Sequence, residues 1–163
     1  YREAWLRNDT DIEFQLADIL LPDGVLRVDK AMSVNPVEAH LGHYALPHLT
    51  NTIKEKTIKK HGYTAYVIEN EKHQLAMVPL YGWKEVGFEH TSGLHPESDE
   101  CTVLNAKEIF TGEKIFVTLL LWNKAGMKVD NKRLFPVKDV LVSHDKKSVT
   151  VLLNDGTRKE VVW

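Results

Sequence analysis

Cysteine is almost absent from this sequence, since Cys101 is the single one among 163 residues. No disulfide can form within the chain, which excludes the small secreted domains that depend on disulfides. The compartment stays open, because cytoplasmic proteins and disulfide-free periplasmic or surface proteins share this feature. A chain of this length can bury roughly two thirds of the surface that its unfolded form exposes, so its core needs no metal or disulfide.

An excess of one charge and a long apolar run are also lacking. The formal net charge is −2, and Lys and Arg are scattered among Asp and Glu, which does not indicate a surface for nucleic acid or an anionic membrane. The longest apolar run, residues 117–122, is interrupted by Thr118 and is far shorter than the roughly 20 residues of a transmembrane helix. We therefore expect no nucleic acid and no membrane among the partners.

Signatures of common enzymes are missing as well. The sequence contains no G-x-S-x-G, no glycine-rich phosphate loop and no C-x-x-C. Cys101 follows Asp99 and Glu100, and acidic neighbours disfavour the thiolate that a nucleophile needs. Carboxylates are plentiful, but only the fold decides which two meet as an acid and a base. We therefore assign no catalytic residue and expect no cofactor.

The patterns that are present favour β-strands. Alternating or β-branched apolar segments recur between turn signals, and no segment has a capped helical periodicity. The predicted strands are 12–21, 25–32, 37–46, 63–69, 74–81, 83–90, 102–109, 114–122, 137–143, 148–153 and 158–162. Together they predict an all-β fold, a two-sheet antiparallel β-sandwich of the supersandwich kind with little or no helix, and a barrel is the alternative.

Some segments allow more specific predictions. Pro22-Asp23-Gly24 predicts a hairpin turn, and residues 110–113 predict a turn between two further strands. Residues 114–122 are apolar on both faces and are expected at the centre of a covered sheet, with Trp122 in the core. Residues 52–60 carry five charges among nine positions, which is typical of an edge strand, although a short exposed helix is an alternative.

The densest group of functional side chains is residues 38–48, EAHLGHYALPH, with three of the eight histidines. On a regular strand His40 and His43 face opposite sides, so a zinc site would need a bulge at Gly42, and we predict no metal. His40 and Tyr44 would share a face with Gly42 between them, where a ligand could approach the backbone. His40, His43 and Tyr44 are ligand-binding candidates, with His40 and Tyr44 as weak catalytic ones; partly buried structural histidines are the alternative.

Trp83 is the fourth ligand-binding candidate. Aromatic rings stack on the apolar face of sugars, and Trp83 stands between Tyr81-Gly82 and the charged Lys84 and Glu85. Exposure to a ligand and burial in the core are equally compatible with this pattern.

The stretch from Asp18 to His48, DILLPDGVLRVDKAMSVNPVEAHLGHYALPH, resembles the C-terminal β-domain of domain-of-unknown-function family 2264, a bacterial family. The shared features are a strand ending in an LLP-x-G turn, an RV strand and a strand of small residues with a glycine near residues 41–44. The resemblance implies an N-terminal helical toroid in the parent chain, the architecture of polysaccharide lyases, and a periplasmic or extracellular location. It supplies no catalytic motif for the histidines.

The beginning of the chain, which lacks Met, and its strand-like end lead us to expect that residues 1–163 form one β-sandwich domain of a longer protein. The leading hypothesis is an accessory domain of a carbohydrate-processing protein, either a polysaccharide lyase or a glycoside hydrolase. Its partners would be the helical domain of the same parent and carbohydrate. A stand-alone carbohydrate-binding or adhesion module and a mutarotase-like enzyme that uses His40 and Tyr44 are the alternatives.

Overall fold

The computed structural model describes residues 12–47, 53–70, 73–91, 101–124 and 134–163, and the side chains of residues 42–47, 91, 123 and 124 are outside this description. All elements of the described residues are β-strands, arranged in two antiparallel sheets, so the predicted all-β fold with two antiparallel sheets is confirmed. No helix among these residues has the length and apolar character needed to cross a membrane.

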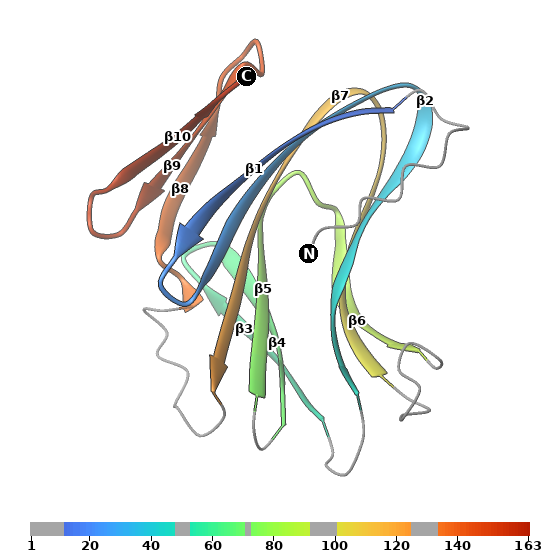
Figure 1. Cartoon of the computed structure of the whole chain (residues 1–163), viewed down its shortest axis with the longest axis vertical. Coiled ribbons are helices and arrows are strands. Elements are labelled where there is room, and N and C mark those ends of the chain that lie inside the picture. Colours follow the sequence, from blue (N-terminus) through green and yellow to red (C-terminus); the bar gives the residue numbers. More distant parts are fainter. Residues whose placement is uncertain (1–11, 48–52, 71–72, 92–100, 125–133) are drawn as a thin grey trace.

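Ten strands make up the two sheets (Figure 1). Their bounds are β1 Ile12–Leu21, β2 Gly24–Pro47, β3 Lys54–Lys60, β4 Tyr63–Glu69, β5 His73–Tyr81, β6 Glu85–Thr91, β7 Cys101–Lys124, β8 Val137–Val142, β9 Ser148–Leu153 and β10 Arg158–Val162. The larger, seven-stranded sheet has the order β1-β2-β7-β5-β4-β3, with β6 paired to β7. The smaller sheet has the order β10-β9-β8.

The turn signals at Pro22-Asp23-Gly24 and at residues 154–157 placed two hairpins correctly. Strand β1 pairs with β2 from the Leu21–Gly24 end, around Pro22 and Asp23, and β9 pairs with β10 across the Asn154–Thr157 turn. Gly156 has a φ of +88°, a conformation that glycine adopts without a steric penalty. The charged segment also lies where predicted, because β3 pairs only with β4 and forms an edge of the larger sheet.

Two predicted interruptions are wrong, because β2 and β7 are each continuous over 24 residues. Residues 34–36 were expected to separate two strands, but they are a bulge between the pairs Ser33–Gly112 and Val37–Phe110. Residues 110–113 were expected to be a turn, and they are instead a bend within β7, with Gly112 at a φ of +75°. Paired strands can bend together at such irregularities without losing the ladder on either side.

Contacts along β7 show how sharp this bend is. Residues six positions apart in a straight strand are separated by about 20 Å. The ring centroids of Phe110 and Phe116 are nevertheless only 5.7 Å apart, and the Lys114 ammonium lies 3.0 Å from a Glu108 carboxylate oxygen. Figure 1 shows β2 and β7 arching over together at this point. The larger sheet therefore folds back on itself.

We call the folded-over part the return layer; it comprises residues 37–47 of β2, residues 101–110 of β7 and strand β6. The remaining part of the larger sheet, the main layer, carries apolar side chains that meet those of the return layer. The buried members of this core are Val25, Leu41, Ile53, Ile68, Met77, Leu104, Ala106 and Leu120. Ala31, Phe110 and Phe116 form a smaller cluster.

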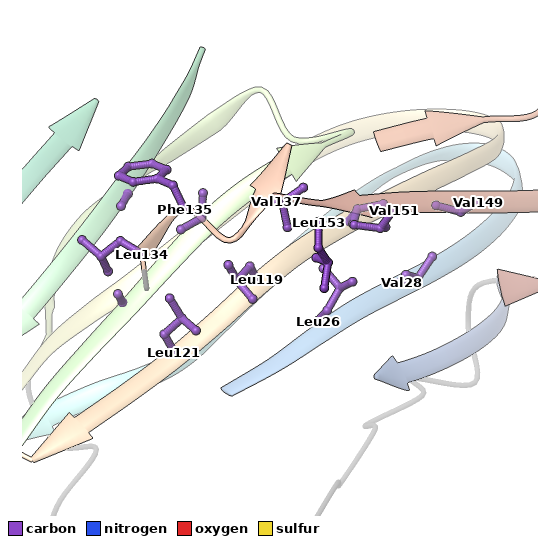
Figure 2. Close-up of a cluster of buried hydrophobic side chains, with 14 of the residues drawn as sticks. Leu26, Val28, Leu119, Leu121, Leu134, Phe135, Val137, Val149, Val151 and Leu153 are labelled. Carbon is purple, nitrogen blue, oxygen red and sulfur yellow. The ribbon is translucent and has the colours of Figure 1, made fainter. Parts of the chain in front are cut away.

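The opposite face of the main layer packs against the smaller sheet (Figure 2). Leu119 on β7 is fully buried there, which confirms the predicted covered strand of Ile115, Val117, Leu119 and Leu121. The labelled side chains are Leu26, Val28, Leu119 and Leu121 of the main layer, Leu134 and Phe135, and Val137, Val149, Val151 and Leu153 of the smaller sheet. Residues 115–121 of β7 are thus covered on both faces.

Trp122 corrects one prediction about this strand. It was expected in the core, but 46% of its surface is exposed. It lies two residues from the end of β7 at Lys124. A run of apolar residues marks a covered strand, but it does not show where along that strand the cover ends.

Candidate functional site

His40 lies in the return layer on β2 and faces away from the core. The neighbouring Leu41 is buried, whereas the side chains of His40 and Glu38 are 46% and 48% exposed. The imidazole Nε2 of His40 and the Glu38 carboxylate are hydrogen-bonded, as expected for side chains two residues apart on one strand face. His40 is therefore available to a ligand on the outer surface.

The structure places His43 and Tyr44 in the same strand, but their side chains are outside the described part. The pairing of β2 with β7 shifts between Leu41–Ala106 and Tyr44–Leu104, so one extra residue is accommodated there. A bulge near Gly42 is thus present in the backbone. Because it interrupts the alternation, the period-two argument that put His40 and Tyr44 on one face does not apply.

Trp83 packs between the two layers. Its ring stacks on Phe116 with centroids 4.2 Å apart and an interplanar angle of 27°. Its indole N–H donates a hydrogen bond of 2.8 Å to the hydroxyl of Thr118, which is fully buried. The side chain is partly exposed, but its polar atom and one ring face are used by the fold.

A buried carboxylate occupies the inside of the β7 bend. The side chain of Glu108 is 2% exposed, and Oε1 accepts hydrogen bonds from Lys114 at 3.0 Å and is paired with Lys84 at 3.3 Å. Burial raises the pKa of Glu108, but the hydrogen bonds and positive charges of Lys114 and Lys84 outweigh it, so the pKa is lowered overall. Oε2 is buried and has no hydrogen-bond partner among the described residues.

A second group of polar side chains covers the outer face of the return layer. Along β7, Leu104, Ala106, Glu108 and Phe110 are buried, so the residues between them point outward. The register aligns His40, Lys107 and Glu85 across three adjacent strands, and it pairs Asn105 with Gly87. We call this surface the polar platform; it consists of Glu38, His40, Glu85, Gly87, Glu89, Asn105 and Lys107.

The polar platform has an open position at Gly87, on its outer strand β6. A Cβ built on Gly87 would meet no atom within 4 Å. Beside it, the Asn105 amide donates to Glu89 Oε2, while Asn105 Oδ1 is buried and has no partner among the described residues. The Lys107 ammonium lies 3.9 Å from Glu89 Oε2. Donors and acceptors therefore surround a position that carries no side chain.

Metal ligation has no support in the part of the chain that the structure describes. No three of its His, Cys, Asp and Glu side chains gather closely enough to hold an ion. Cys101 is buried in β7.

Comparisons with known proteins find little. No family model matches the chain, and no curated protein matches it. One solved structure that is similar is a crystal structure of a heparan sulfate lyase HepC mutant from Pedobacter heparinus, with a TM-score of 0.47 and 12% sequence identity over 86% of this chain. The chain spans 22% of that protein's length, and we carry no residue role over from it.

Sequence reasoning identified His40 but missed the other members of both clusters. Gly87 had a usable signal, since a glycine inside a strand often marks a close approach of a ligand or of another backbone. No sequence signal pointed to Glu108, because only the β7 bend and the segment before β6 bring Lys114 and Lys84 next to it.

Proposed function

We propose that this chain is an accessory β-domain of a carbohydrate-processing protein and that the polar platform binds saccharide. The observation that carries the proposal is the open position at Gly87, which lies opposite Asn105 and between Glu85 and Glu89 on one face of β6, with Lys107 and His40 on the neighbouring strands. Sugar hydroxyls both donate and accept hydrogen bonds, so a surface that offers carboxylate, amide and cationic groups together suits them. The missing Cβ allows a sugar ring to approach the backbone of β6.

The resemblance of residues 18–48 to family 2264 supports the carbohydrate class, and we propose membership of that family. In this proposal a helical domain of the same parent chain supplies the catalytic groups, and the described domain holds the polymer. The isolated 163-residue chain is then expected to bind saccharide without cleaving it. A stand-alone binding or adhesion module would use the same platform, and it is distinguished by a parent chain without a catalytic domain.

Substitution of Gly87 tests the site. Gly87→Val fills the open position, and a β-branched residue is favourable in a strand, so we expect binding to be lost while stability is retained. Binding of a panel of oligosaccharides is measured by calorimetry, and unfolding is followed by circular dichroism.

The matched control is Glu160→Val, which places the same side chain at an exposed position of β10 in the smaller sheet. It should leave binding unchanged. Unchanged binding by a folded Gly87→Val variant would refute the platform as the site, and turnover of any oligosaccharide by the isolated chain would favour a complete, mutarotase-like enzyme instead.

A further inference from the structure

We infer that the polar platform selects uncharged saccharides and discriminates against anionic ones such as uronates and sulfated sugars. This inference rests on the proposed function and adds the chemical class of the ligand. It follows from the charges on the platform and from the way they are already paired.

Carboxylates outnumber cations on this surface. Glu38, Glu85 and Glu89 supply three negative charges, whereas Lys107 is the one ammonium of the platform. Glu85 on β6 lies directly opposite Lys107 on β7, and Glu89 lies on the same face of β6 four residues further along the strand. Glu85 and Glu89 therefore flank Gly87 on one face of β6, each about 7 Å from it along the strand, whereas Glu38 lies two strands away on β2.

The side-chain hydrogen-bond donors Lys107 and His40 of the platform are engaged by these carboxylates. Lys107 lies 3.9 Å from Glu89 Oε2, and His40 is bonded to Glu38. Lys84, the exposed lysine next to Glu85 in sequence, is paired with Glu108 between the layers. An arriving carboxylate or sulfate would therefore compete with protein carboxylates for Lys107 and His40, and at Gly87 it would lie between Glu85 and Glu89.

An uncharged sugar avoids this conflict. Its hydroxyl protons can be donated to the exposed Glu38 and Glu85, and hydrogen bonds to charged acceptors are stronger than those between neutral groups. Its own oxygens can accept from Lys107 without adding a negative charge. The platform therefore favours a ligand that is rich in hydroxyl groups and carries no charge.

Matched oligosaccharides test the selection directly. We would measure binding of the full 163-residue chain to pairs that differ only at C6, such as mannan against mannuronan and glucan against glucuronan oligomers. We expect binding to the neutral member of a pair and at least roughly tenfold weaker binding to its uronate at low ionic strength. The difference should shrink at high salt, because repulsion between exposed charges is screened.

Charge-removing variants provide the second arm. Glu85→Gln and Glu38→Gln should each reduce the difference in affinity between the neutral oligosaccharide and its uronate counterpart. The control Glu160→Gln on β10 should leave this difference unchanged. Tighter binding of the uronate, or a difference in affinity that Glu85→Gln leaves unchanged, would overturn this inference but not the proposed function. Binding of neither member in any pair overturns both.

Discussion

At the scale of single residues, Glu108 combines deep burial with a formal charge. A carboxylate inside the fold is tolerated because Lys114 and Lys84 supply both hydrogen bonds and opposite charge. These contacts join three separate points, namely the two arms of the β7 bend and the segment that leads into β6. We interpret the cluster as an electrostatic clamp on the bend.

The clamp predicts how stability depends on pH. The pKa of Glu108 is lowered in the folded protein from its usual 4.5, so its contribution to stability is complete above that value and is lost as the pH falls through the lower folded pKa. Glu108→Gln should reduce the free energy of unfolding at neutral pH and flatten its decline in acid. Urea unfolding at several pH values measures both effects.

The control for this experiment is Glu160→Gln on the exposed surface of β10. In this variant the free energy of unfolding should decline in acid as steeply as it does in the wild-type chain. A Glu108→Gln variant with the same acid slope as wild type would show that the clamp contributes nothing.

At the scale of elements, the bend in β7 depends on a positive φ at Gly112. A Cβ there would meet no atom within 4 Å, so the cost of a side chain is conformational and not a clash. We expect Gly112→Ala to lower the free energy of unfolding by about 1 to 2 kcal/mol, the usual penalty for an L-residue in the left-handed region.

Gly87→Ala is a matched comparison, because Gly87 also has open space and lies in β6 at an ordinary φ. It should change stability by less than about 0.5 kcal/mol or increase it slightly. Equal effects of the two substitutions in thermal unfolding would mean that the φ of Gly112 does not hold the bend.

At the scale of the whole molecule, β7 connects the layers. Its central part is covered by the smaller sheet on one face and by the return layer on the other, as Figures 1 and 2 show together. Stability should therefore depend strongly on this strand. The smaller sheet packs on the same cluster through Val137, Val149, Val151, Leu153 and Val161.

Leu119→Ala tests this dependence. Removing a fully buried leucine side chain leaves a cavity between the sheets, and we expect a loss of about 2 to 5 kcal/mol in the free energy of unfolding. Leu141→Ala is the control, since Leu141 on β8 is 53% exposed and should cost far less. A loss below about 1 kcal/mol for Leu119→Ala would contradict the central position of β7.

The sequence by itself determined which segments are strands, the hairpins at Pro22 and Gly156 and the edge strand β3, but not the continuity of β2 and β7. These features depend on local chemistry: alternating apolar residues in a strand such as β9, turn residues such as Pro22 and Gly156, and the charges of residues 54–60. It also named His40 as a ligand-binding candidate, with a partly buried structural role as the alternative, because histidines are concentrated in residues 38–48.

Only the tertiary structure decided where the sheet folds back and what that brings together. Residues 110–113 have the composition of a turn, and whether they reverse the chain or bend a paired strand depends on the partner that lies beside them. The burial of Glu108, the exposure of Trp122 and the grouping of His40 with Asn105 and Gly87 all follow from pairings between distant segments. Local sequence patterns do not predict such pairings, because the alternation of side chains indicates that a segment is a strand but not which distant strand it pairs with.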